Sequence, residues 1–252
     1  MSVEKDVILR GQRIVIPERA RNALLASFTV YTREFASKVF SRILICWPGI
    51  DGDVEQRVRS CPMCQQAASS PSSQEPLAWP SSGEPWTPMH MDYAGPIKGK
   101  MIVVIVDSHS GWTVGIRAKS ATTEVIVDRR GPVWARFGLP TCILTDKGIA
   151  FAGAAFQEFI KRNGTRHMQT APYHPQSNGL AERAVRNVKE AFIKLTDGAL
   201  EIRLQRWLHS HRRTPSAAHG GKAPAEMLFN FLPHSRLDII QADVLKNQKT
   251  TQ

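Results

Sequence analysis

The order of apolar patterns in the second half of the chain limits its fold more than any other feature. Three consecutive segments have the pattern of β-strands: 89–94, 101–107 and 112–118, with turns between them at Gly95–Lys100 and Ser108–Gly111. Helical and strand patterns then alternate: a helix at about 122–137, a strand at 141–145, a helix at about 153–163 and a strand at 166–169. Strands first, followed by alternating helices and strands, predict an α/β domain of three layers with a mixed sheet.

A Pro- and Ser-rich stretch without periodicity separates this region from the N-terminal part of the chain. Before it, two short strand patterns surround Arg10–Arg13, a helical pattern runs from about Pro17 to Phe40, and a shorter one covers DVEQRV. The sequence therefore predicts a small, mainly helical first domain. The predicted boundaries are 1–66 for the first domain, 67–83 for a linker, 84–236 for the α/β domain and 237–252 for a polar tail.

The net charge indicates which kind of partner the protein binds, and the cysteine content indicates the redox state of its compartment. The formal net charge is +11 over 252 residues, with a pI near 9.9, which favours a polyanionic partner. The longest apolar run, 101–106, is too short to cross a membrane, and the N-terminus lacks the pattern of a signal peptide. The four cysteines do not form a disulfide framework, so we expect a reducing compartment.

Three acidic residues have the placement of metal ligands. Asp92 lies in MHMDYAGP, Asp146 ends the β-rich run CILT, and Glu182 opens a helix after a Pro-, Asn- and Gly-rich loop. Carboxylates from two strand ends and one helix can converge on a pair of divalent ions. Two such ions suit in-line attack on a phosphodiester, since one activates the nucleophile and the other stabilises the leaving oxygen.

The flanking segments closely resemble the integrases of retroviruses and gypsy-type LTR retrotransposons. The resemblance rests on these blocks: WPGIDGDVEQRVRSCPMCQ, PWTPMHMDYAGP, IVVIVDSHSGW, FGLPTCILTDKG, APYHPQSNGLAERAV and HRRTPSAAHGGKAPAEMLF, in that order, over nearly the whole chain. It implies a ribonuclease H-like core with a mixed five-stranded sheet. It also implies that Asp92, Asp146 and Glu182 bind two Mg²⁺ or Mn²⁺ ions, for 3′-end processing of DNA and transfer of that end into a target strand.

The resemblance further implies DNA contacts on both sides of Glu182. Tyr173, Gln176 and Asn178 match polar positions of the family's mobile catalytic loop, and Arg186 and Lys189 match basic positions after the catalytic Glu. The residues alone leave other interpretations open. The glycine and prolines of this loop also fit ordinary turn chemistry. Glu182, Arg186 and Lys189 share one helical face, which also fits a solvated stripe with a weak ion pair.

Other polar residues in the same blocks are assigned elsewhere. Asp107, at a strand end, has a position that suits capping of the turn through Ser108–Ser110, so we leave it out of the triad. His109 and His174 are conceivable general bases, but a two-metal mechanism needs no histidine.

Two departures from the family pattern bear on activity and on zinc. Lys147 follows Asp146 where the family usually has Asn, so an ammonium group can compete for that carboxylate or contact a phosphate. Cys61 and Cys64 match the cysteine pair of the family's zinc-binding N-terminal domain, but no histidine precedes His90. Two thiolates do not complete a structural zinc site. We expect weak zinc binding or none, and a less stable first domain.

The chain is thus expected to be a polynucleotidyl transferase of the integrase type, acting in the nucleus as a homo-oligomer on element ends and chromosomal DNA. The alternative is a decayed or domesticated DNA-binding or oligomerising descendant, which the missing histidines, Lys147 and the early end at KNQKTTQ favour. A metal nuclease without joining activity is a third hypothesis. Among these, the enzyme predicts Mn²⁺ binding near Asp92 and Asp146.

Overall fold

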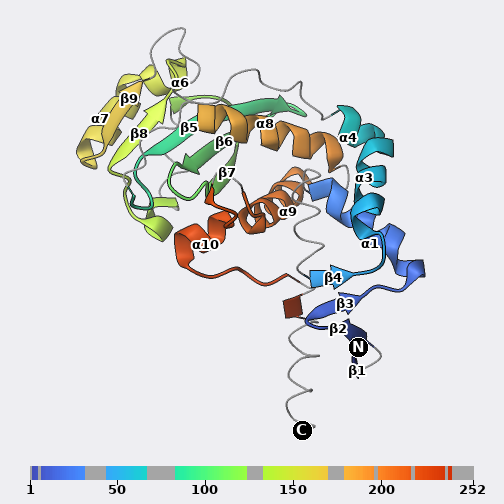
Figure 1. Cartoon of the computed structure of the whole chain (residues 1–252). Helices are drawn as coiled ribbons and strands as arrows, with labels where there is room; N and C mark the ends of the chain where they lie inside the picture. The colour runs from blue at the N-terminus through green and yellow to red at the C-terminus, as the bar shows by residue number, and fades with distance from the viewer. Residues whose placement is uncertain are drawn as a thin grey trace. The chain divides into compact units, whose positions relative to one another are not determined.

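The computed structural model describes two compact units (Figure 1). Residues 2–4, 7–31, 44–66, 83–123, 133–169, 179–195, 198–216, 219–235 and 238–239 are described. Contacts group Met1–Ala68 with Arg213–Gln252 in the first unit and Ser69–Arg212 in the second. The second unit therefore ends before the limit of 236 expected from the sequence, and the four predicted boundaries remain predictions. Within the described part of the chain, no helix is long and apolar enough to cross a membrane.

The first unit combines short helices with a small sheet. Its strands are β1 (Ser2–Glu4), β2 (Val7–Arg10), β3 (Arg13–Val15) and β4 (Ile45–Cys46), and its helices are α1 (Glu18–Tyr31), α3 (Ile50–Ser60), α4 (Pro62–Gln66) and α10 (Pro224–Phe229). The strands lie in the order β1-β2-β3-β4, antiparallel except for the parallel pair β3–β4. The sequence prediction of strands on either side of Arg10–Arg13 is confirmed, whereas β1 and β4 were not predicted.

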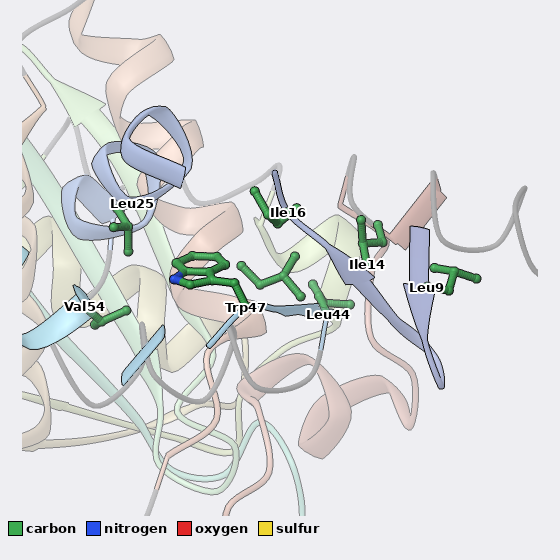
Figure 2. Packing of buried hydrophobic residues seen from close by; sticks show 8 residues of the cluster. Leu9, Ile14, Ile16, Leu25, Leu44, Trp47 and Val54 are labelled. Atoms are coloured by element: carbon green, nitrogen blue, oxygen red, sulfur yellow. The ribbon is translucent and has the colours of Figure 1, made fainter. Parts of the chain in front are cut away.

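An apolar cluster forms the core of this first unit (Figure 2). Its buried members are Leu9, Ile14, Ile16, Leu25, Leu44, Ile45, Trp47 and Val54. Trp47 joins the strands to the helices, because its indole Nε1 donates a hydrogen bond of 2.7 Å to Asp53 Oδ2 on α3. The Arg21 guanidinium of α1 lies 5.8 Å from the centre of the same ring. The burial of these apolar side chains stabilises the unit.

A mixed sheet of five strands forms the centre of the second unit. The strands are β5 (Met89–Ile97), β6 (Lys100–Asp107), β7 (Thr113–Ala118), β8 (Cys142–Thr145) and β9 (Arg166–Gln169), in the order β7-β6-β5-β8-β9. β5, β6 and β7 form an antiparallel meander, while β8 and β9 run parallel to β5 and to each other. This arrangement confirms the predicted α/β class with a mixed sheet.

The helices that flank the sheet of the second unit include α6 (Ile149–Ala152), α7 (Ala154–Arg162), α8 (Gly179–Lys194) and α9 (Leu200–Arg213) (Figure 1). Alternation along β7 assigns α9 to one face, because Thr113 contacts His211, and Leu204 is the nearest neighbour of Gly115. α7 contacts the other face, where Gln157 and Phe156 meet His167. Register then decides which face each β5 and β8 side chain occupies.

Two details of the second unit differ from the sequence prediction. The predicted turn Gly95–Lys100 is shorter, because β5 continues to Ile97 through an irregular register after Ala94. Gly95 permits this continuation, since a Cβ there would lie 2.7 Å from Met101 Sδ at a φ of 144°. The helix expected from residue 153 is preceded by the short helix α6, and the helix expected over 122–137 lies partly outside the described residues.

Candidate functional site

Asp92 and Asp146 occupy equivalent positions on neighbouring parallel strands. Met91 of β5 pairs with Thr145 of β8, and each aspartate is the next residue along its strand. Parallel strands in register lie about 5 Å apart, so the two aspartates come side by side. Asp146 directly follows the end of β8, whereas Asp92 lies within β5 and not at the strand end expected from the sequence, because β5 continues to Ile97. Asp92 also pairs with Val104 of β6, which places its side chain on the face that α9 covers.

Glu182 reaches this region from the first turn of α8. The helix packs on β5 and β6, and its apolar positions are buried as the helical period predicts. These positions are Ala181, Ala184, Val185, Val188, Ala191 and Phe192. Glu182, Arg186 and Lys189 form the opposite, exposed stripe of the helix. The sequence prediction of one apolar face and one charged face is confirmed.

Electrostatic coupling ties the three carboxylates together. Burial raises the pKa of Asp92 to about 6; the Tyr93 N–H opposes this rise, while the charges of Asp146 and Glu182 add to it and Lys189 reduces it. Burial also raises the pKa of Glu182, Arg186 opposes that shift, and Asp146 reinforces it. Asp92 therefore lies within electrostatic range of Asp146 and Glu182, while Lys189 acts on Asp92 and Arg186 acts on Glu182 with the opposite sign.

Each of the two aspartates accepts a hydrogen bond from a backbone N–H one or two residues further along the chain. Tyr93 N donates to Asp92 Oδ1 at 2.6 Å, and Gly148 N donates to Asp146 Oδ1 at 2.9 Å. A Cβ at Gly148 would lie 2.9 Å from the same Asp146 oxygen, so a larger residue there would displace the carboxylate from this position. Among the described residues, no group of three His, Cys, Asp or Glu side chains is close enough to hold a metal ion as placed.

Lys147, the departure from the family pattern, is exposed beside Asp146. Among the ion pairs of the described residues, none joins Lys147 to Asp146. The Asp146 carboxylate is instead oriented by the backbone of its own loop. The effect of Lys147 on metal binding remains a prediction.

Comparison with known families identifies the domain that holds this site. Residues 84–175 match the family described as integrase core domain. The chain contains an integrase core domain. The match begins just before β5 and includes Asp92 and Asp146, and it ends before α8 and Glu182.

The chain is similar to viral polyproteins and to a protein of Caenorhabditis elegans. An uncharacterized protein of Caenorhabditis elegans is 28% identical over 97% of the chain, and the Pol polyprotein of Radiation murine leukemia virus (strain Kaplan) is 30% identical over 69% of it. The Gag-Pol polyprotein of Baboon endogenous virus (strain M7) is 27% identical over 91%. The chain spans 20%, 31% and 14% of these three relatives, respectively.

A solved retroviral structure shows the same fold. The chain resembles one from the simian T-cell lymphotropic virus intasome in complex with PP2A regulatory subunit B56 gamma, with a TM-score of 0.55 and 18% identity. The similarity covers 85% of this chain and 75% of the viral one. The ribonuclease H-like architecture of the integrase core is thus shown.

Asp107 is a structural carboxylate in this integrase core, in agreement with the sequence analysis. It is fully buried and accepts hydrogen bonds from the backbone and hydroxyl of Ser110, at 3.0 and 2.5 Å. It also accepts one of 3.0 Å from the backbone N–H of Trp86. These bonds close the β6–β7 turn and attach the segment before β5 to it. His109 lies in this turn, while His174 lies outside the described residues.

The integrase catalytic loop predicted from the sequence falls in a part of the chain that the structure does not describe. Tyr173, Gln176 and Asn178 all lie within residues 170–178, between β9 and α8. Their predicted DNA contacts remain predictions.

The cysteine pair lies at the start of α4 in the first unit. Burial raises the pKa of Cys61, but hydrogen bonds from Cys64 and Met63, together with the charge of Arg57, outweigh burial and lower it overall. In the described residues no His, Asp or Glu joins Cys61 and Cys64 to make a metal-binding group. The two thiols do not fit a structural zinc ion, which needs four ligands.

Sequence reasoning missed three residues that support Asp146. Gly148 lies against its carboxylate, and Thr145 and His167 belong to a hydrogen-bond network behind it. The residue type of Thr145, a hydroxyl directly before the aspartate, was a visible signal. The role of His167 had no signal in the sequence, because only the β8–β9 pairing brings it near Thr145.

Proposed function

We propose that this chain is a DNA integrase that uses Asp92, Asp146 and Glu182 for phosphodiester chemistry. In the first step, water attacks a phosphodiester near a DNA 3′ end, and the bond to the terminal fragment breaks to leave a free 3′-hydroxyl. In the second step, that 3′-oxygen attacks a target phosphodiester, and the target strand's own 3′-oxygen leaves. The observation that carries the proposal is the equivalent placement of Asp92 and Asp146 beyond the Met91–Thr145 pair.

The donor set fits divalent cations that prefer oxygen. Three carboxylates are hard ligands of the kind that Mg²⁺ and Mn²⁺ favour. Burial is the largest cause of the raised pKa of Asp92, and repulsion from the negative charges of Asp146 and Glu182 raises it further. A bound cation would relieve this repulsion. When bound, two such ions would activate the attacking oxygen and stabilise the leaving one. The three side chains would have to turn toward one another to share them.

Basic residues beside the carboxylates are proposed to hold DNA. Arg186 and Lys189 are exposed on the α8 face that begins at Glu182, and both influence the carboxylates electrostatically. A net charge of +11 supports a phosphate backbone as partner. We propose that Tyr173, Gln176 and Asn178 contact the DNA end near the scissile phosphate.

The assembly and compartment follow from the substrate. One active site acts on one DNA end, so joining both ends of an element calls for more than one copy of the chain. We propose self-association, which the similarity to a chain from an intasome supports. We propose the nucleus as the compartment, because the proposed target is chromosomal DNA.

A strand-transfer assay with purified protein, labelled DNA ends and Mn²⁺ tests the proposal. We expect joined products from the unaltered chain and none from Asp92→Asn, Asp146→Asn or Glu182→Gln, each of which should still unfold in a cooperative melting transition. Strand transfer that persists in any of these folded variants would defeat the assignment. Cleaved but unjoined products would instead identify a metal nuclease with the same fold.

A second candidate function is a non-catalytic DNA-binding or oligomerising descendant of an integrase. Lys147 and the incomplete zinc ligand set favour it. This candidate predicts DNA binding and self-association with no Mn²⁺-dependent products. The variant Lys147→Asn separates the two cases, because it restores the family pattern: products only in this variant would show that Lys147 alone suppresses the chemistry.

A further inference from the structure

A chain of hydrogen bonds lies behind Asp146, on the α7 side of the sheet. Thr145 Oγ1 donates to the Asp146 carbonyl at 2.8 Å and lies 2.9 Å from His167 Nε2. Gln157 Nε2 of α7 lies 2.9 Å from His167 Nδ1 and donates to the Phe151 carbonyl, also at 2.9 Å. Thr145 is fully buried, so these bonds are shielded from water at the end next to Asp146.

The donors and acceptors of this chain define one tautomer of His167. The Thr145 hydroxyl has a single proton and gives it to the Asp146 carbonyl, so His167 Nε2 must be the donor to Thr145 Oγ1. Nδ1 is then the acceptor, and of the two Gln157 side-chain atoms near it the donor Nε2 is closer, at 2.9 Å, than the acceptor Oε1, at 3.2 Å. The Gln157 amide supplies one proton to Nδ1 and the other to the Phe151 carbonyl. Each donor in this series of hydrogen bonds has an acceptor when His167 is neutral and carries its proton on Nε2.

Packing holds the imidazole in this orientation. The buried ring of Phe156 meets His167 edge to face, with 5.1 Å between centroids. Burial lowers the pKa of His167, which favours the neutral form that the hydrogen bonds require. β9 pairs with β8 so that His167 lies opposite Ile143, one alternation before Thr145 on the same face.

This network reaches Asp146 from the side opposite to the other carboxylates. Asp92 lies on the α8 and α9 face, whereas Thr145 and His167 lie on the α7 face. The network therefore contacts the main chain of Asp146 and leaves its carboxylate to the site. Hydrogen bonds of this kind, made by residues that do not bind the metal themselves, commonly fix the orientation of a metal-binding residue.

We infer that His167 is a positioning residue: through the Thr145 hydroxyl it fixes the Asp146 backbone, and with it the Asp146 carboxylate, at the end of β8. The inference rests on the proposed role of Asp146. It assigns α7 a part in the active site through Gln157. It also accounts for a hydroxyl at position 145, where an apolar residue would otherwise suit a fully buried strand position.

The test compares His167→Phe, Thr145→Val and the double variant. Phenylalanine keeps the edge-to-face contact with Phe156 and removes both ring nitrogens, while valine keeps the shape of threonine and removes the hydroxyl. Met168→Leu, next in β9, is the matched control. We expect each single variant to lower Mn²⁺ affinity and strand-transfer kcat about tenfold, with KM for DNA unchanged.

The double variant distinguishes action through Thr145 from general damage. If His167 acts through Thr145, the double variant should be no worse than either single variant, because both break the same chain. Losses that multiply, or wild-type Mn²⁺ affinity and kcat in His167→Phe, would overturn the inference. If Asp146→Asn also kept full Mn²⁺ affinity and activity, the proposed function itself would fail rather than this inference alone.

A spectrum of the unaltered chain gives a readout independent of activity and of the variants' folding. Long-range ¹H–¹⁵N correlation of His167 at neutral pH should show a neutral ring protonated on Nε2. A ring protonated on Nδ1, or on both nitrogens, would contradict the hydrogen-bond directions and overturn the inference. Thr145→Val should change the chemical shift of Nε2, and Met168→Leu should leave it in place.

Discussion

The backbone N–H of Trp86 donates a hydrogen bond of 3.0 Å to Asp107 Oδ1, and so joins the start of the integrase core to the β6–β7 turn. The same carboxylate accepts two hydrogen bonds from Ser110 in that turn. Asp107 lies on the strand next to Asp92, yet its oxygens are committed to the fold. This contrast makes the roles of the two aspartates separable by experiment.

Asp107→Ala should destabilise the core by about 2–4 kcal/mol, because it leaves several buried donors without an acceptor. Chemical denaturation followed by tryptophan fluorescence measures the loss. Asp92→Ala, on the neighbouring strand, is the comparison and should cost far less stability. Equal losses in the two variants would contradict the structural assignment of Asp107.

The metal-free core should become less stable as pH rises through about 6. The folded-state pKa of Asp92 is about 6, above its ordinary 3.8, so the folded state holds this proton more tightly than the unfolded state does. The resulting stability is present below about pH 4 and is lost as Asp92 ionises. Asp92→Asn should remove this slope and, above pH 7, exceed the unaltered protein by on the order of 1–2 kcal/mol.

Denaturant titrations between pH 4 and 8 in the presence of a chelator measure this slope. The same ionisation predicts tighter Mn²⁺ binding at pH 7 than at pH 5, since protons compete for the carboxylate. A stability difference between Asp92→Asn and the unaltered protein that stayed constant over the whole range would refute the pKa assignment.

Arg186→Gln and Lys189→Gln should each weaken DNA binding and lower the slope of log affinity against log salt by about one. The reason is that each removes one cation from the exposed face of α8. Arg162→Gln is the control, because Arg162 is an exposed cation on α7 and pairs there with Glu158 at 2.8 Å. Fluorescence anisotropy at several salt concentrations measures the slopes. The idea fails if all three variants change binding equally.

The first unit should unfold at the same temperature with and without a zinc chelator, because Cys61 and Cys64 have no further ligand in the described residues. Its stability should depend on the Trp47 cluster instead. Trp47→Ala should cost about 3–5 kcal/mol through the cavity that it leaves. Calorimetry with metal analysis tests both statements, and stoichiometric zinc that is lost together with the fold would be the contrary result.

Gly115→Ala should destabilise the contact between β7 and α9 by about 1–3 kcal/mol. A Cβ at Gly115 would lie 2.9 Å from Cδ1 of the buried Leu204 side chain, closer than packed carbon atoms approach. Leu204→Ala in the same chain should recover part of the loss by making room. Thermal melts of the two single variants and the double variant measure this coupling.

The sequence by itself determined most elements of the second unit and the resemblance to the integrase family. Alternating and helical periods located β6, β8, β9 and the buried face of α8, because side-chain burial follows backbone period directly. The motif around Asp92 and Asp146 indicated an integrase core, which the family match shows. Even the turn role of Asp107 followed from local sequence, since its Ser110 partner lies three residues away.

Only the tertiary structure decided which residues lie next to the aspartates of the candidate site. The parallel register of β5 with β8 brings Asp92 and Asp146 level, and the β8–β9 register brings His167 to Thr145. Local periodicity says nothing about which strands become neighbours or in what register. Strand pairing and register depend on packing between residues far apart in the sequence, because each strand pairs where its apolar side chains become buried against the others.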